Sequence, residues 1–597
     1  MMAAATMLMA AGLTAQQRFE VVEATIPGVH AAMEARQLTC RALVQAYLDR
    51  IAAYDKRGPA LNAVQNVNAR ALLEADSLDG VLRAKGARGP LHCVPVLLKD
   101  QVETRDMPTT YGSIIYKDFT PTRDATIVTR LEAAGAIILA KTTMGEFAQR
   151  YVGSGAGIIR NAYDPTRNPS GSSGGSASAV AANFGLVGIG EDTGGSVRGP
   201  AAVSSLVGLR PTLQLVSRFG MLPANPTQDT MGPMTRTVAD AARVLDVIAG
   251  YDANDPITAF AVGHVPATYT TALVPGALRG ARIGVLRFPR DTTPDNAPLR
   301  LSADSATLRF GTGVQGNLPA AGATVTTGAR TGGGATGNVP ALPTTTPAQT
   351  PAVRRDSLVQ RDSIARRDSL RRRDSVERVL KVEFAKVTPV FERALADLRA
   401  QGAIVIDSLR VPAVPGSRVD NSYETEQATD AYFAQHPNAP VRTLREIILA
   451  GTVNPWRARS LMPYLGKTTD DAGYLTVLKS REALRVAILK MMADRNLDVL
   501  VYATYDAPPT VIAADVLTNP RPVDGYGRGD NRGLSPLLGF PALTVPAGFT
   551  AEVLPVGLEF LGRPFSEAQL LGYGFAYEQA TKHRRPPASA PVLGTRR

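Results

Sequence analysis

Cysteine, histidine and long apolar runs are all scarce in this sequence. Its 597 residues include two cysteines, Cys40 and Cys93, and five histidines. Two thiols in so long a chain do not make a disulfide framework. No internal run reaches the roughly 18 apolar residues that a membrane span requires. These absences exclude a small disulfide-stapled protein and argue against an internal membrane span.

Acidic residues are outnumbered by basic ones, but the excess is local. The formal net charge is +12. Residues 354–378 contain nine arginines against five acidic residues, and residues 582–597 contain five Lys or Arg and no acid. The rest of the chain is therefore nearly balanced. We interpret the basic end as a solvated tail and expect no nucleic-acid partner.

The first fifteen residues have no charge and consist mostly of Ala, Met and Leu, before the polar Gln16-Gln17-Arg18. This pattern is typical of the apolar core and cleavage end of a secretory signal, although a basic start is missing. We therefore expect residues 1–17 to be a signal peptide and the chain to be exported to the periplasm or cell envelope. The alternative is a ragged apolar terminus on a cytoplasmic protein.

Short apolar runs alternate with helical patterns over most of the chain. The alternation predicts an α/β fold: one large domain with a central mixed, mostly parallel β-sheet covered by helices on both faces. Thr39, Asp124 and Ser566 are the expected helix caps, the last with Gln569 in a capping-box spacing. The expected strands are residues 94–98, 136–140, 186–190, 281–286, 404–407, 499–502, 543–545 and 556–561. The expected helices include 125–134, 175–183, 238–249, 390–400 and 567–581.

One region breaks this alternation. Residues 311–353 have few large apolar side chains and cannot bury enough surface to offset their ordering entropy, which predicts disorder. An Arg-Asp-Ser hexapeptide repeat follows, and its apolar residues spiral around a helix without forming a stripe. It is interpreted as a solvated charged helix, the alternative being a partner-binding arm. We expect an insertion at 293–380 that splits the domain into 18–292 and 381–587, with a basic tail at 588–597.

The residues that most directly indicate function lie between 168 and 200, with a lysine upstream. Lys99 ends an apolar strand, and two glycine-rich segments follow, Gly171-Ser172-Ser173-Gly174-Gly175-Ser176 and Asp192-Thr193-Gly194-Gly195-Ser196-Val197-Arg198-Gly199-Pro200. Glycines allow backbone N–H groups to converge on one point, as an oxyanion hole requires. The serines and the lysine supply a nucleophile, a relay hydroxyl and an amine base without histidine. A thiol nucleophile at Cys93 is the alternative, but we interpret Cys93 as a small buried residue.

These motifs resemble the amidase signature family of serine hydrolases. The stretch from Asp192 to Pro200 matches its nucleophile motif, and Gly171 to Ser176 matches its Gly-Ser-Ser-Gly-Gly-Ser motif. Lys99 matches the family lysine. The resemblance extends over residues 20–290 and 380–590 and implies the amidase signature fold. The chain departs slightly from the family pattern at Ser170, where a glycine or another small residue is common, and at Glu191, where Ser or Thr is common.

The resemblance also implies a role for each matching residue. Ser196 is the nucleophile, and Ser172, after a cis peptide bond, relays its proton to Lys99. Lys99 must be neutral to accept that proton, so burial has to lower its pKa. The N–H groups of Ser196 and of Thr193, Gly194 and Gly195 form the oxyanion hole. Ser173, Asp192 and Arg198 support the site, and no metal or organic cofactor is needed.

The expected activity is hydrolysis of the C–N bond of a small-molecule carboxylic amide through a Ser196 acyl-enzyme. Aliphatic, aryl and peptide C-terminal amides all fit. The alternative is the A-type subunit of a glutamyl-tRNA(Gln) amidotransferase, which releases ammonia from glutamine. A nucleotide-binding protein is disfavoured because the chain has no Gly-x-x-x-x-Gly-Lys-Ser/Thr segment. An inactive scaffold is disfavoured because all three triad residues are present.

Deleting Thr312–Arg373 and joining the ends with a short linker should leave folding and catalysis nearly unchanged, because the cost of closing a surface loop grows only logarithmically with its length. Activity and thermal unfolding of the deletion variant check this. Hydrogen exchange on the intact chain should find residues 311–353 unprotected within seconds. An unfolded variant, or strong protection of the segment, contradicts the predicted insertion.

Overall fold

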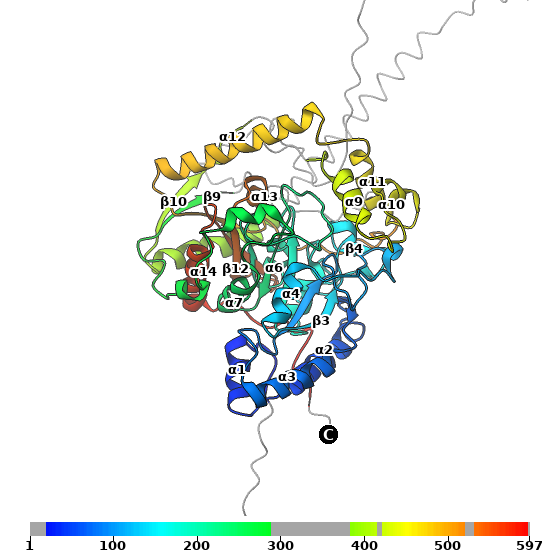
Figure 1. Ribbon diagram of the computed structural model, residues 1–597. Helices are drawn as coiled ribbons and strands as arrows, with labels where there is room; N and C mark the ends of the chain where they lie inside the picture. Colours follow the sequence, from blue (N-terminus) through cyan, green and yellow to red (C-terminus); the bar gives the residue numbers. More distant parts are fainter. Residues whose placement is uncertain (1–18, 288–381, 415–420, 520–530, 595–597) are drawn as a thin grey trace, which may run out of the picture. The chain divides into compact units, whose positions relative to one another are not determined.

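The computed structural model describes residues 19–287, 382–414, 421–519 and 531–594. One sheet of eleven strands runs through this part of the chain, in the order β1-β3-β2-β6-β8-β7-β12-β13-β11-β9-β10 (Figure 1). Its strands are β1 (Val64–Val67), β2 (Pro95–Lys99), β3 (Ile137–Thr142), β6 (Val187–Asp192), β7 (Val207–Arg210), β8 (Thr230–Thr235), β9 (Arg282–Leu286), β10 (Ile404–Leu409), β11 (Val499–Ala503), β12 (Ala542–Phe549) and β13 (Pro555–Leu561). A separate two-stranded ribbon pairs β4 (Val152–Gly153) with β5 (Gly157–Ile158).

Parallel and antiparallel pairs are segregated within the large sheet. The ladders β3–β2–β6 and β11–β9–β10 are parallel. The strands from β6 through β8, β7, β12 and β13 to β11 pair antiparallel, as does β1 with β3. The α/β fold with a mixed sheet flanked by helices is confirmed. All eight expected strands are present in the large sheet, where β1, β7 and β8 are additional, and the ribbon strands β4 and β5 were not expected either.

Helices pack around the sheet. Figure 1 shows α4, α7 and α14 beside the strands, and these helices contact β3, β8 and β12 respectively. The α-helices are α1 (Ile26–Glu34), α2 (Cys40–Tyr54), α3 (Ala71–Lys85), α4 (Thr126–Ala133), α5 (Gly174–Ala181), α6 (Arg198–Ala202), α7 (Val238–Ile248), α9 (Thr425–Ala434), α10 (Leu444–Leu449), α11 (Pro455–Leu461), α12 (Ala472–Asp494), α13 (Leu534–Leu538) and α14 (Glu567–Thr581). Residues 382–400 are helical as well. Short 3-10 helices lie at Ile114–Tyr116, Glu146–Ala148, Pro256–Ala261, Tyr269–Ala272 and Met462–Tyr464.

Of the three expected helix caps, one is confirmed and two are wrong. The Thr39 side chain accepts a hydrogen bond from the Ala42 N–H at the start of α2. Asp124 does not cap α4; it accepts from the Arg105 N–H and pairs with its guanidinium. The Ser566 hydroxyl donates to the Arg563 carbonyl, so no capping box forms at α14. In both cases the side chain hydrogen-bonds another nearby residue and is not free to cap the helix.

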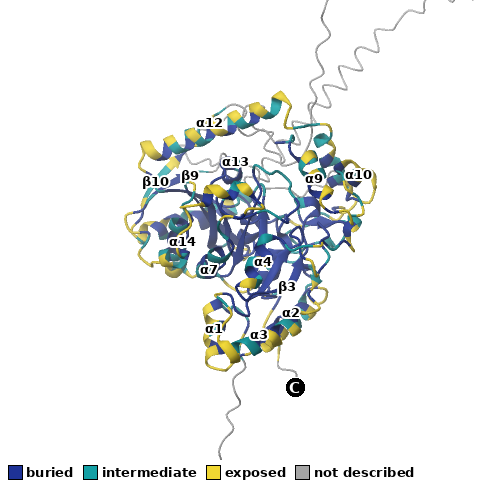
Figure 2. Ribbon diagram, in the orientation of Figure 1, coloured by how far each residue is buried: buried dark blue, intermediate teal, exposed yellow. Residues whose placement is uncertain are grey.

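Helix α5 determines how closely the glycine-rich segment before it approaches the sheet. All eight of its residues are buried, and all are Gly, Ala, Ser or Val. Such small side chains let the helix contact β2 and β6, whose residues are all buried. Figure 2 shows buried residues gathered around the sheet and exposed residues along outer helices such as α12. A Cβ at Gly175 would overlap the Thr143 carbonyl oxygen, so only glycine fits there. The segment before α5 is thereby held against the ends of these strands.

The two chain segments on either side of the predicted insertion meet in one core. Strands β9 and β10 pair in parallel, and helix 382–400 adds Val390, Leu395 and Leu398 to the main hydrophobic cluster. The predicted insertion at 293–380 and the predicted signal at 1–17 lie outside the described residues and remain predictions.

The chain end differs from the expected solvated tail. Ala590 is buried, and its carbonyl accepts from the Arg50 guanidinium at 2.7 Å.

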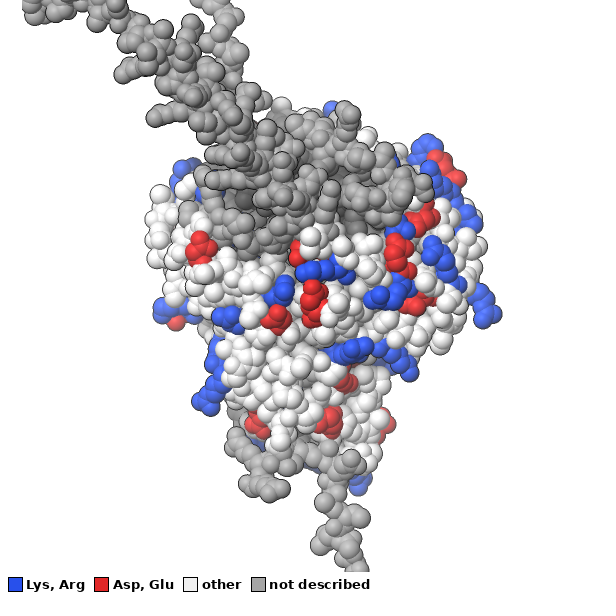
Figure 3. Space-filling model, turned by 180° about the vertical axis from the view of Figure 1, so that it is seen from behind, with Lys and Arg blue, Asp and Glu red and all other residues white. Residues whose placement is uncertain are grey.

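On the face in Figure 3, acidic side chains lie among the basic ones over the described residues. This part of the surface has no continuous basic stripe of the kind that follows a phosphate backbone. None of the described helices is both long enough and apolar enough to cross a lipid bilayer.

Cys93 is a small buried residue, as expected, but it is not a free thiol, which was not predicted. Cys40, at the start of α2, and Cys93, just before β2, form a disulfide that closes 53 residues of sequence. A disulfide-bonded sulfur is no thiolate, so Cys93 is not the nucleophile in this form of the protein. No local pattern indicates that these two positions lie together, because only the packing of the N-terminal helices on the sheet brings them into contact.

Replacing both cysteines, as in Cys40→Ser with Cys93→Ser, should lower the free energy of unfolding by about 2–4 kcal/mol, because the cross-link restricts the unfolded chain. Turnover per folded molecule should be retained. Denaturant unfolding of the oxidised protein and the double variant, with activity measured alongside, checks both parts. Loss of activity in a variant that is still folded would restore the thiol hypothesis.

Candidate active site

Strand pairing brings the predicted lysine next to the predicted nucleophile segment. Lys99 is the last residue of β2, a strand whose five residues are all buried. β2 pairs in parallel with β6, so the carboxyl ends of both strands meet at one edge. β6 ends at Asp192, four residues before Ser196. The parallel register therefore places the lysine beside the start of the glycine-rich turn.

The segment before α5 places Ser172 on the lysine. The Lys99 Nζ donates to the Ser172 Oγ at 2.7 Å, and both residues are fully buried. The Gly171–Ser172 peptide bond is cis. A Cβ at Gly171 would overlap the carbonyl oxygen of Arg150, so the turn requires glycine at that position. The Ser172 carbonyl accepts from the Gly145 N–H at 3.0 Å, which anchors the turn to the chain after β3.

Ser196 lies in the turn between β6 and α6 and is partly exposed. The Asp192 carboxylate holds this turn, accepting from the Gly195 N–H at 2.7 Å and the Val197 N–H at 3.1 Å. Gly195 has a φ of 116°, which other residues rarely adopt. Because its N–H is directed at Asp192, the Gly195 donor is already occupied. Among the hydrogen bonds of the described residues, none joins Ser196 to Ser172 or Lys99.

Two buried arginines balance Asp192. Arg198 Nε lies 3.1 Å from one carboxylate oxygen, and Arg210 Nη1 lies 3.3 Å from the other. Burial by itself would raise the pKa of Asp192, but the two guanidinium groups hold it well below its usual range. Arg198 also pairs with buried Glu559, which accepts from the Tyr502 hydroxyl at 2.8 Å. The predicted supporting residues Asp192 and Arg198 therefore belong to one buried ionic network, together with three residues not predicted: Arg210, Tyr502 and Glu559.

Glu191 is a partner of Lys99 that the sequence motifs do not reveal. Its Oε2 accepts from the Lys99 Nζ at 2.8 Å, and its carbonyl oxygen lies 3.3 Å from the same nitrogen. Ser173 holds the Glu191 backbone, donating to its carbonyl at 3.2 Å and accepting from its N–H at 3.3 Å. Burial lowers the pKa of Lys99, and the Glu191 carboxylate opposes that shift. The sequence did contain one signal for this contact: a carboxylate directly before Asp192, at the end of the strand that pairs with β2.

A second carboxyl, Asp229, lies near this pair at the start of β8. One of its oxygens accepts from the N–H groups of Ala224 and Asn225, at 2.7 and 2.8 Å. Burial, followed by the charge of Glu191, raises the pKa of Asp229 to about 8. Among the described residues, no group of three or more His, Cys, Asp or Glu side chains is arranged to hold a metal ion.

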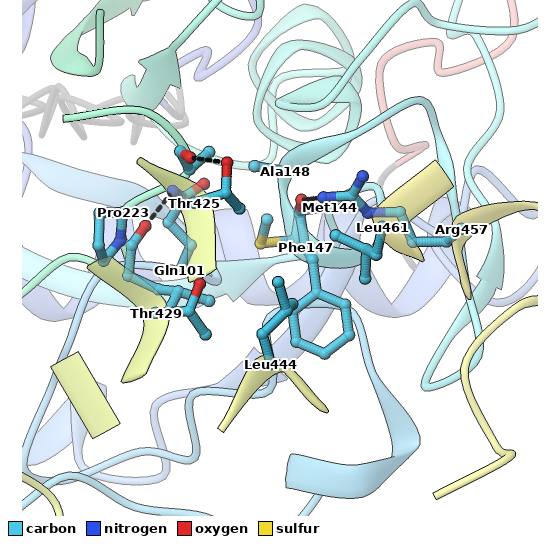
Figure 4. Close-up of a pocket in the computed structure, with 12 residues that line it drawn as sticks. Gln101, Met144, Phe147, Ala148, Pro223, Thr425, Thr429, Leu444, Arg457 and Leu461 are labelled. Atoms are coloured by element: carbon cyan, nitrogen blue, oxygen red, sulfur yellow. Dashed lines mark hydrogen bonds between the residues drawn. The ribbon is translucent and has the colours of Figure 1, made fainter. Parts of the chain in front are cut away.

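A narrow cavity borders the segment that anchors Ser172. Figure 4 shows Met144, Phe147 and Leu444 on one part of its wall, with Gln101 and Thr425 opposite. Gln101 donates to the Leu222 carbonyl at 2.8 Å, and Thr425 donates to the Ala224 carbonyl at 3.0 Å. The remaining wall is formed by Ala148, Pro223, Thr429, Arg457 and Leu461. The cavity is thus mostly apolar and lies between the ends of β2 and β3 and helices α9 to α11.

This chain is similar in sequence and in fold to known proteins. The family model described as amidase matches residues 42–309 and 382–571. A probable amidase from Arabidopsis thaliana is 28% identical over 612 residues, covering 97% of this chain and 95% of its own. The A-type subunit of the glutamyl-tRNA(Gln) amidotransferase from Chloroflexus aggregans is 30% identical, covering 94% and 98%. The crystal structure of the peptide amidase from Stenotrophomonas maltophilia has a TM-score of 0.70 at 31% identity, covering 95% and 99%. With its family match over most of its length and this fold, the chain belongs to the amidase signature family.

Proposed function

We propose that the protein is an amidase that hydrolyses a carboxylic amide to the acid and ammonia or an amine, with Ser196 as nucleophile, Ser172 as relay and Lys99 as base. The observation on which this rests is the 2.7 Å hydrogen bond between the buried Lys99 amine and Ser172, at the edge where Ser196 follows β6. Family membership supports hydrolase activity, and the motif positions support the roles proposed for the three residues.

The proposed reaction follows from these positions. Neutral Lys99 accepts a proton from Ser172 as Ser172 takes the Ser196 proton, and the Ser196 oxygen attacks the amide carbon. The N–H groups of Thr193, Gly194 and Ser196 are proposed donors to the oxyanion, whereas that of Gly195 is held by Asp192. The proton then returns through Ser172 to the leaving nitrogen. Water, activated by the same pair, hydrolyses the acyl-enzyme.

The second candidate is a component of an amidotransferase, favoured by the relative from Chloroflexus aggregans. The probable amidase from Arabidopsis and the peptide amidase cover this chain equally well, and they favour a free-standing hydrolase. Ammonia release from glutamine, measured with and without a partner protein, separates the two. Hydrolysis of simple or peptide C-terminal amides by the isolated chain supports the amidase; glutamine turnover that depends on a partner supports the amidotransferase.

Ser196→Ala should reduce amide and ester hydrolysis by a factor on the order of 10⁴ or more, because the covalent route is lost. Steady-state turnover of a p-nitroanilide and a p-nitrophenyl ester measures this, with circular dichroism confirming the fold. Ser204→Ala is the control, since Ser204 is a nearby serine that is buried and its hydroxyl has no hydrogen-bond partner among the described residues. Near wild-type turnover by folded Ser196→Ala rules out the proposed nucleophile.

Lys99→Ala should also lower turnover by several orders of magnitude, and Ser172→Ala somewhat less. Lys99→Arg should fail as well, because a guanidinium keeps the charge but does not deprotonate in proteins. In the wild type, activity should rise with pH as Lys99 loses its proton, and level off below the ordinary lysine value of 10.5, since burial lowers its pKa. The pH dependence of kcat/KM tests this. Full activity of Lys99→Arg excludes the lysine as base.

A further inference from the structure

Glu191 makes contacts that the proposed reaction does not use. Its side chain is fully buried. One carboxylate oxygen lies on the Lys99 amine, and the other accepts from the Thr193 hydroxyl at 2.6 Å. Thr193 belongs to the turn that contains Ser196. A single carboxylate therefore links the proposed base to the proposed nucleophile segment.

The contacts of Lys99 Nζ define how a neutral amine would sit. Three acceptors surround the nitrogen: Ser172 Oγ, Glu191 Oε2 and the Glu191 carbonyl oxygen. A protonated lysine has three N–H donors and can satisfy all of them. A neutral amine has only two N–H bonds and one lone pair. If both N–H groups of the neutral amine donate to Glu191, its lone pair points at Ser172. This is the direction from which Lys99 must accept a proton.

We propose that Glu191 is a positioning residue, which holds Lys99 by its carboxylate and its carbonyl oxygen so that the amine lone pair faces Ser172, and which links that amine to the Ser196 turn through Thr193. This inference rests on the proposed function. The Glu191 backbone is itself fixed, because Ser173 bonds both its N–H and its carbonyl. The family departure at Glu191 thus has a structural consequence in this chain.

The charge of Glu191 also sets the pH range in which the lysine can act. Besides Glu191, the charged groups that act on this pair are Asp192 on β6, Asp229 before β8 and Arg210 on β7. The Glu191 carboxylate favours the ammonium, and so it raises the pKa of Lys99 and moves the active range to higher pH. Removing the charge of Glu191 should lower the pKa of Lys99 and so move the active range to lower pH. Asp229 offsets part of this shift. Without the charge of Glu191, Asp229 ionises more readily, and its own negative charge raises the pKa of Lys99.

The test is the pH dependence of kcat/KM for p-nitroanilide hydrolysis by the full-length chain. Glu191→Gln keeps a side-chain acceptor for Lys99 but removes the charge, so its alkaline rise should shift to lower pH by about one unit with a plateau within about tenfold of wild type. Glu191→Gln with Asp229→Asn should shift it further. Glu191→Ala removes the acceptor, and its plateau should fall by a factor on the order of 10² at every pH.

The control is Glu567→Gln, another buried glutamate, which accepts the Thr212 N–H at 2.7 Å and should leave the profile unchanged. Circular dichroism establishes that each variant is folded. An unshifted profile in Glu191→Gln, or a folded Glu191→Ala as active as wild type, overturns the inference. A fully active Lys99→Arg instead overturns the proposed function, so the two failures are distinguishable.

Discussion

The burial of the Lys99 amine, which has no access to water, is the constraint that determines which charged groups lie around it. Burial disfavours the ammonium of Lys99, and an isolated buried charge would be strongly unfavourable. The carboxylate of Glu191 offsets this penalty. The turn after β6 needs a second carboxylate, Asp192, to hold its N–H groups, and that charge is balanced in turn by Arg198 and Arg210. Glu559 then balances Arg198. Buried charges around Lys99 and the turn after β6 are thus balanced by partners that reach across the sheet from β2 to β13.

Most of the fold could be predicted because apolar runs and helical spacing are local signals. The strands that were missed lack such signals. β8 contains a glycine and a proline, β7 contains a glycine, and β1 has two polar residues among four. Their positions are decided by pairing with neighbours far away in sequence, as where β8 joins β6 to β7. The same holds for the Cys40–Cys93 bond, because its two cysteines are 53 residues apart in sequence and no local pattern pairs them.

The candidate site was predictable to the extent that it consists of short motifs. Lys99, Ser172 and the turn around Ser196 are each recognisable in their own segment. The contact between Lys99 and Glu191 joins the ends of two strands 92 residues apart, and the motif pattern marks Glu191 only as an unusual residue. Arg210 and Glu559 come from β7 and β13, whose place next to the turn follows from sheet order. Charge balance in a buried site is a three-dimensional property, which explains why those partners were missed.

The disulfide between Cys40 and Cys93 has a consequence for where the chain matures. Such bonds form and persist in oxidising compartments and are rare in the cytosol, and the expected export would place the chain in such a compartment. Counting free thiols in the protein as isolated from its own cells tests this, since two free thiols would contradict it. Recombinant protein made in a reducing cytosol would be a different covalent species from protein folded with its cross-link. Half-lives measured on one preparation would not describe the other.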